Sequence, residues 1–198
     1  MNVFSLAKTP LDGPEQACSP ERLASRVLER TELRLTKPTR QQIGVLPRRP
    51  IRVVLDNVGN GYNVGAMFRL CDALMVEHLT ICSPDFTLRK RRLSQAAQGT
   101  QFWVPWSHMT SAETCVAEAR QAGYQIGVIE LTSTSIAPEA FVPKFPLCLV
   151  VGAELTGVTR AIVSQADVAV AIPMHGMANS LNLATAAAIV LYEVCKHL

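Results

Sequence analysis

The chain has 198 residues, of which 48% are hydrophobic and 18% are charged, and its formal net charge is +3. This length suits one domain, or one domain with a short appendage, and the composition excludes disorder along most of the chain. No apolar run approaches the length of a transmembrane helix, and the first residues do not resemble a secretory signal, so we expect a cytoplasmic protein.

Six cysteines are spread along the chain without any CxxC pair. A disulfide scaffold or a zinc site would need clustered spacing. The sequence therefore predicts buried, reduced thiols and no metal site.

Positive charge is concentrated near the N-terminus: residues 1–50 contain nine Lys or Arg and five Asp or Glu, whereas residues 51–198 contain ten and eleven. Ser19-Pro20-Glu21 is a helix-start signal, and a helix over about 20–34 would carry a basic stripe. Three prolines within residues 36–50 predict a linker. We therefore expect a basic tail, helix and linker over 1–50, followed by a domain over 51–198. The stripe contains Arg22, Arg26 and Arg30.

From residue 51 onward, short apolar strands alternate with helical patterns. This alternation predicts an α/β fold, in which a mostly parallel sheet is covered by helices on both faces. The expected strands are 51–56, 78–82, 125–130, 147–151 and 168–172, and the expected helices are 63–74, 93–98, 111–122, 159–165 and 180–197.

A glycine-containing segment, Gly59 to Gly65, follows the first expected strand and opens a helix, which invites comparison with a dinucleotide-binding loop. Its spacing is GxGxxxG instead of GxGxxG, and Cys82-Ser83 stands where a ribose-binding acid is expected. A P-loop is excluded because no GK[ST] occurs. A nicotinamide-dependent dehydrogenase therefore remains only an alternative.

Three segments at expected strand ends contain polar residues that are candidates for chemistry. Arg69 lies among apolar neighbours and either faces solvent or pairs with an anion. Glu154, after an apolar strand, is either a solvated turn residue or a ligand-binding one. Ser180 can cap the last helix, and Asn182 is unusual in the first turn of an apolar helix.

Taken together, these segments resemble the SpoU/TrmH family of SPOUT RNA 2′-O-ribose methyltransferases, and in particular the tRNA guanosine 2′-O-methyltransferases. The similar motifs are Asn63-Val64-Gly65-Ala66-Met67-Phe68-Arg69, Gly152-Ala153-Glu154-Leu155-Thr156-Gly157, and Ile172-Pro173-Met174 through Ser180-Leu181-Asn182-Leu183-Ala184. Ala153 and Leu155 depart from the usual second motif, and Leu74-Met75 stands where a glycine is common.

The resemblance implies a C-terminal trefoil knot, a homodimer with its sites beside the interface, and S-adenosylmethionine as cofactor. It also implies that backbone groups of three loops bind the adenosine and that apolar side chains cover it. Methyl transfer from a sulfonium needs no metal. The implied cofactor-binding residues are Leu131, Gly152, Ile172, Met174 and Leu181.

The resemblance further implies which residues act on the ribose hydroxyl. A hydroxyl is a poor nucleophile at neutral pH, so the site must remove its proton or stabilise the forming alkoxide. Arginine stays protonated and is an improbable base, so we favour an electrostatic role for Arg69 over proton abstraction. Ser180 and Asn182 would position the substrate, Glu154 would orient Arg69 or a ribose hydroxyl, and Asn63 begins the first motif.

RNA is the expected partner. The resemblance favours tRNA over rRNA, because rRNA-directed members of the family often carry a separate N-terminal RNA-binding domain and residues 1–50 are too short for one. Besides the N-terminal stripe, we expect the run Arg89, Lys90, Arg91 and Arg92 to bind backbone phosphates. An rRNA methyltransferase and a non-catalytic RNA-binding module of the same fold are the alternatives.

Overall fold

The structure is a computed structural model that describes residues 26–35, 37–84, 86–87 and 91–198. The described residues divide between two units, one that ends at Leu46 and one over Pro47–Leu198.

In the first unit, a short helix α1 (Arg30–Leu35) replaces part of the helix predicted over 20–34. Residues 26–29 are not helical. The Glu32 carboxylate accepts a hydrogen bond from the backbone N–H of Glu29 at 2.7 Å and pairs with Arg26 at 2.6 Å. These bonds satisfy groups at the helix start and lower the pKa of Glu32 to about 2. The helix therefore begins at Arg30, while residues 20–25, including Arg22, lie outside the described residues.

The predicted linker contains a second short helix, α2 (Arg40–Ile43). A reciprocal cap forms it: the Thr39 hydroxyl accepts from the N–H of Gln42 at 3.3 Å, and the Gln42 side chain accepts from the N–H of Thr39 at 2.9 Å. A capping box of this kind satisfies two donors that would otherwise lack partners. The segment predicted as a linker over 36–50 thus contains one short capped helix.

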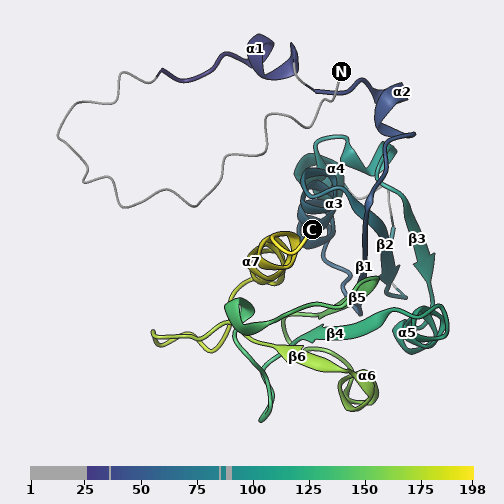
Figure 1. Ribbon diagram of the computed structural model, residues 1–198, viewed down its shortest axis with the longest axis vertical. Coiled ribbons are helices and arrows are strands. Elements are labelled where there is room, and N and C mark those ends of the chain that lie inside the picture. Colours follow the sequence, from purple (N-terminus) through teal and green to yellow (C-terminus); the bar gives the residue numbers. More distant parts are fainter. Residues whose placement is uncertain (1–25, 36, 85, 88–90) are drawn as a thin grey trace. The chain divides into compact units, whose positions relative to one another are not determined.

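Six parallel strands form the sheet of the second unit, in the order β3-β2-β1-β5-β4-β6 (Figure 1). The central pair is β1 and β5, in which Ile51 pairs with Leu147 and Asp56 with Gly152. The prediction of a parallel sheet is confirmed. The strands are β1 (Arg49–Asp56), β2 (Val76–Cys82), β3 (Trp106–Met109), β4 (Gln125–Ile129), β5 (Leu147–Gly152) and β6 (Val168–Val170).

The sheet differs from the prediction in one missed strand and in strand bounds: β1 and β2 each begin two residues earlier than expected, at Arg49 and Val76. The edge strand β3 was missed because three of its four residues are only partly buried, His108 is exposed, and they show no apolar run. The strand expected over 168–172 ends at Val170, and the chain then turns into the loop that reaches residue 182.

Helices cover both faces of the sheet, as predicted. One apolar core joins α3 (Gly61–Ala73), α4 (Arg91–Ala97) and α7 (Leu183–Cys195) to one face, and another joins α5 (Ala112–Gln121) and α6 (Arg160–Gln165) to the opposite face (Figure 1). Side chains alternate along β1: Val53 and Leu55 enter the first core, and Val54 enters the second.

Asparagine caps decide where two helices begin. The Asn60 side chain accepts the N–H of Tyr62 at 2.9 Å, so α3 starts at Gly61 and not at residue 63. The Asn182 side chain accepts the N–H groups of Ala184 and Thr185, so α7 starts at Leu183 and not at residue 180. The cap suggested for Ser180 was therefore wrong, since Asn182 fills that role.

The five described cysteines carry free thiols, as expected. Cys71, Cys82 and Cys148 are buried, whereas Cys115 and Cys195 are partly exposed, which corrects the expectation that all are buried. Among the described helices, none combines the length and apolar character that a membrane crossing needs. The trefoil knot stays a prediction of the resemblance.

Candidate active site

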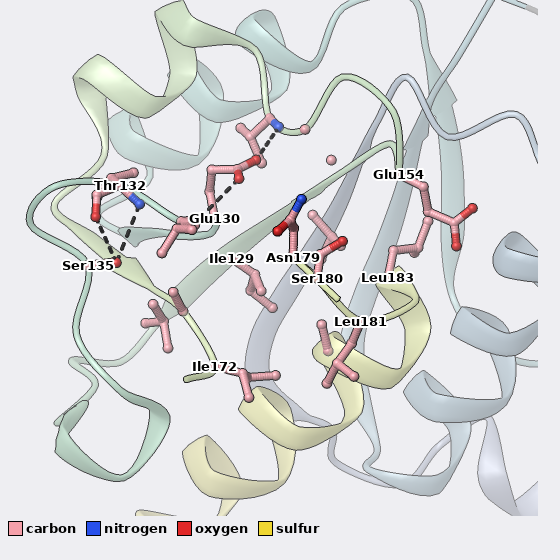
Figure 2. A pocket seen from close by; sticks show the side chains of 18 of the residues that line it. Ile129, Glu130, Thr132, Ser135, Glu154, Ile172, Asn179, Ser180, Leu181 and Leu183 are labelled. Carbon is pink, nitrogen blue, oxygen red and sulfur yellow. Dashed lines mark hydrogen bonds between the residues drawn. The ribbon is translucent and has the colours of Figure 1, made fainter. Parts of the chain in front are cut away.

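A large cavity lies at the carboxyl ends of β4, β5 and β6, which is where parallel α/β sheets bind ligands. Its volume is about 1190 Å³, and three loops enclose it: those after β4, β5 and β6 (Figure 2). All five residues that the resemblance assigns to the cofactor line this one cavity: Leu131, Gly152, Ile172, Met174 and Leu181.

The cavity wall combines apolar side chains with backbone and a few polar groups. Ile129, Ile172 and Leu181 supply apolar surface, and Glu130 supplies a carboxylate (Figure 2). A turn at Thr132 is closed by the Ser135 hydroxyl, which donates to the Thr132 carbonyl at 3.0 Å. This mixture of apolar surface and few polar groups suits an organic ligand with an aromatic ring.

Hydrogen bonds join one residue from each of the three motif segments. The Asn182 amide nitrogen donates to Asn63 Oδ1 at 2.9 Å and to Glu154 Oε1 at 2.6 Å. Because its oxygen caps α7, every polar group of the Asn182 side chain has a partner, and its orientation is fixed. Asn63 is only 6% exposed, so the network is anchored in the protein interior. The unusual position of Asn182 in the sequence thus has two causes, the helix cap and this network.

A smaller cavity, of about 520 Å³, is lined by the loop after β1, by Asn63 and by the loop after β5. Residues 153–157 of the β5–α6 loop line both cavities. Glu154 extends away from Glu130, out of the centre of the larger cavity (Figure 2). A single loop therefore borders two candidate ligand sites and carries a carboxylate between them.

Ser180 lines the larger cavity and is exposed (Figure 2). Its hydroxyl has no hydrogen-bond partner among the described residues. Since it caps no helix, this hydroxyl is available to a ligand.

Arg69 is not brought into contact with the other candidate catalytic residues. It is exposed on α3, lines none of the three cavities described here, and has no ion-pair or hydrogen-bond partner for its guanidinium among the described residues. A helix turns by about 100° per residue, so Arg69, six positions after Asn63, faces a different side of α3. In the described part of the chain, Arg69 is therefore a charge without a counter-ion.

Some of the basic residues expected to bind RNA are described. Arg91 and Arg92 are exposed at the start of α4 and, with Gly59, Asn60 and Gly61, line a third cavity of about 450 Å³. Arg26 is engaged with Glu32. Arg22, Arg89 and Lys90, and the side chain of Arg30, lie outside the described residues.

Two carboxylates near the cavities were given no role of their own from the sequence: Asp56 was not considered, and Glu130 was placed only in a loop that the resemblance assigns to the cofactor. Asp56 and Glu130 both accept backbone N–H groups of the segment that follows β5. Each acid stands directly at the end of an apolar strand, in IRVVLD and in IGVIE. That position, at the edge where ligands bind, is the signal that could have identified them.

A protein-family model described as the SpoU rRNA Methylase family matches residues 50–192. The chain is 36% identical over 142 residues to the tRNA (guanosine(18)-2′-O)-methyltransferase of Aquifex aeolicus, a match that covers 71% of this chain and 66% of that protein. With the corresponding Escherichia coli enzyme the identity is 32%, over 72% of this chain and 62% of that one. The chain thus spans slightly less than two thirds of these relatives.

The solved structure of the A. aeolicus TrmH/SpoU tRNA modifying enzyme is similar with a TM-score of 0.70 and 32% identity, covering 78% of this chain and 79% of that chain. An AdoMet-bound rRNA methyltransferase from Sinorhizobium meliloti has a TM-score of 0.70 at 26% identity, covering 79% of this chain and 60% of the other.

Proposed function

The chain belongs to the SpoU methylase family, and from that premise we propose that it is an S-adenosylmethionine-dependent methyltransferase of a ribose 2′-hydroxyl in RNA. The observation that carries the proposal is the hydrogen-bonded network of Asn63, Glu154 and Asn182. It joins all three family motifs at the edge of a large cavity. Asn63 is buried whereas Glu154 and Asn182 are exposed, so the network links the protein interior to a polar edge that a ligand can reach.

The larger cavity fits S-adenosylmethionine in its chemistry. Its apolar walls suit the adenine ring, its many loop residues offer backbone N–H and C=O groups, and the Glu130 carboxylate suits a sulfonium cation. We propose that Leu131, Gly152, Ile172, Met174 and Leu181 hold the cofactor. Once bound, the cofactor supplies an electrophilic methyl group.

The residues of the chain would then prepare the ribose hydroxyl. The exposed hydroxyl of Ser180 donates a hydrogen bond to the substrate or accepts one from it. Asn182 keeps the loop before α7 in place. Glu154 orients a ribose hydroxyl from the boundary between the two cavities. Arg69 stabilises the alkoxide as it forms and binds the neighbouring phosphate.

The exposed position of Arg69 supports a dimeric enzyme, because the cavity of its own protomer does not include it. The apolar surface of α7 supports the same proposal: Tyr192 is 58% exposed and Ile189 is 38% exposed. We expect Ile189→Glu together with Tyr192→Glu to shift the protein from dimer to monomer in analytical ultracentrifugation, because two charges would be buried in the interface. A parent protein that sediments as a monomer at micromolar concentration would contradict this assembly.

Transfer RNA is the favoured substrate, since the A. aeolicus and E. coli relatives are named as tRNA methyltransferases. The S. meliloti structure, by contrast, is of an rRNA methyltransferase. We propose that Arg91 and Arg92, together with the basic N-terminal residues, bind the RNA backbone, and that unpaired bases are read in a loop.

Two measurements test the function. Calorimetry with S-adenosylmethionine should show binding, and the protein should then transfer labelled methyl groups to a ribose of tRNA but not of deproteinised rRNA. Absence of binding at millimolar cofactor, with the protein folded, would exclude the methyltransferase. Binding without transfer to any RNA would leave the non-catalytic module, and transfer confined to rRNA would replace tRNA as substrate.

A further inference from the structure

The β5–α6 loop, residues 153–159, borders both cavities and carries Glu154, yet few side chains of its own hold it. Leu155 at its tip is 99% exposed. Within the loop, one backbone hydrogen bond runs from the N–H of Gly157 to the carbonyl of Ala153, at 2.8 Å. Groups outside the loop must therefore fix its position.

Asp56 holds the loop from one side. It stands at the end of β1, is 2% exposed, and its Oδ2 accepts the backbone N–H of Thr159 at 2.7 Å. Its Oδ1 accepts from the Asn57 side chain at 3.0 Å. A buried carboxylate is costly unless its partners compensate it, and among the described residues Asp56 has no ion pair. Its hydrogen bond to the loop is therefore a principal reason for a charge at this position.

Glu130 holds the loop from the other side. It follows β4, and its Oε2 accepts the backbone N–H of Val158 at 2.8 Å, while Oε1 accepts the N–H of Leu131 at 3.0 Å (Figure 2). Gly157 lies so close that a Cβ there would overlap the Glu130 carboxylate. Gly157 also has a φ of +66°, which other residues rarely adopt. The loop and the Glu130 carboxylate are thus fitted to each other.

These two acids come from the strands on either side of β5, since the sheet order is β1-β5-β4. We propose that Asp56 and Glu130 form a carboxylate clamp, in which they act as positioning residues that set the β5–α6 loop, and with it Glu154, between the cofactor and the RNA. This inference rests on the proposed function, because it assigns the two cavities to those two ligands.

The two arms of the clamp bear on different cavities. Glu130 lines the larger one, whereas Asn57 and Thr159, the partners of Asp56, line the smaller one. Glu130→Gln should therefore raise the KM for S-adenosylmethionine about tenfold and leave the KM for RNA within about twofold. Asp56→Asn should instead lower kcat and raise the KM for RNA, by about 10- to 100-fold in kcat/KM, the worth of a hydrogen bond to a charged group.

Asp167→Asn is the matched control. Its Oδ2 accepts the backbone N–H of Ile126 at 2.7 Å, and its Oδ1 pairs with Arg120 at 3.1 Å, so it makes the same kind of bond away from the cavities. We expect this control to lower the melting temperature and to leave kcat and both KM values unchanged.

Thr159→Pro tests the Asp56 arm from the loop side, should Asp56→Asn fail to fold. The substitution removes the N–H that Asp56 accepts, and the φ of Thr159, −51°, is compatible with proline. It should reproduce the RNA-side effect of Asp56→Asn.

Hydrogen exchange separates the clamp from the chemistry. The amides of Val158 and Thr159 should exchange at least tenfold faster in Glu130→Gln and Asp56→Asn, respectively, and at the parental rate in Asp167→Asn. Unchanged exchange, or parental kcat and KM values in both clamp variants, would overturn the proposal. If the parent itself neither binds S-adenosylmethionine nor methylates RNA, the proposed function fails, while exchange still decides whether the clamp exists.

Discussion

Arg69→Ala is expected to lower kcat for RNA methylation by about 100- to 1000-fold, the range seen when a charge-stabilising donor is removed. The Kd for S-adenosylmethionine should stay within about twofold, because Arg69 lies outside the cavity assigned to the cofactor. A single-turnover methylation assay, with calorimetry for the cofactor, measures both. Arg120→Ala is the control, since it removes an exposed arginine on α5, across the sheet from α3.

Arg69→Lys decides between the two roles open to this residue. Lysine keeps the charge but loses the planar fork, so an electrostatic role predicts partial activity that does not rise with lysine deprotonation. Activity that increases with pH in step with that deprotonation would favour proton abstraction instead. Substantial activity in Arg69→Ala would remove Arg69 from the mechanism altogether.

Gly152→Val is the second change with a large expected effect. A Cβ at Gly152 would overlap backbone atoms of Gly157 and Val158, so any side chain there must displace the β5–α6 loop. We expect loss of S-adenosylmethionine binding by about 100-fold or more, because overpacking against backbone cannot be relieved by a side-chain rotation. The steric conflict is between residue 152 and the β5–α6 loop, because Gly152 permits the close backbone approach that shapes this wall of the cavity.

Gly176→Val provides the matched control. Gly176 lines the same cavity, but nothing lies within 4 Å of a Cβ built there. Calorimetry should give near-parental cofactor affinity for this variant, and circular dichroism should show that both variants keep the fold. Parental affinity in Gly152→Val would mean that the loop does not shape the cofactor site.

The architecture of the second unit was predictable because most of its strands appear in the sequence as apolar runs separated by helical patterns. The misplaced boundaries lie where a side chain competes with the apolar pattern, as at Asn60 and Asn182, which cap helices. The strand Trp106–Met109 was missed because an edge strand is buried too little to leave a clear pattern.

The residues that form the candidate site were easier to predict from the sequence than the hydrogen bonds between them. Glu154 and Asn182 stood out as polar residues and Asn63 entered through the resemblance, but only the folded structure reveals that the Asn182 amide binds the other two side chains. Asp56 escaped notice because its partner, Thr159, is a backbone N–H far along the chain, and a backbone partner leaves no trace in the sequence.

The central pair of strands has a consequence for how the protein is made. β1 pairs on one side with β2, which follows it closely, and on the other with β5, which almost half the chain separates from it. During synthesis, the backbone groups of β1 that pair with β5 therefore lack their partners until Leu147–Gly152 leaves the ribosome. Contacts so distant in sequence slow folding, and an exposed strand edge recruits other chains. The amount of folded protein in a cell should thus depend on chaperones and on growth temperature more strongly than its free energy of unfolding suggests.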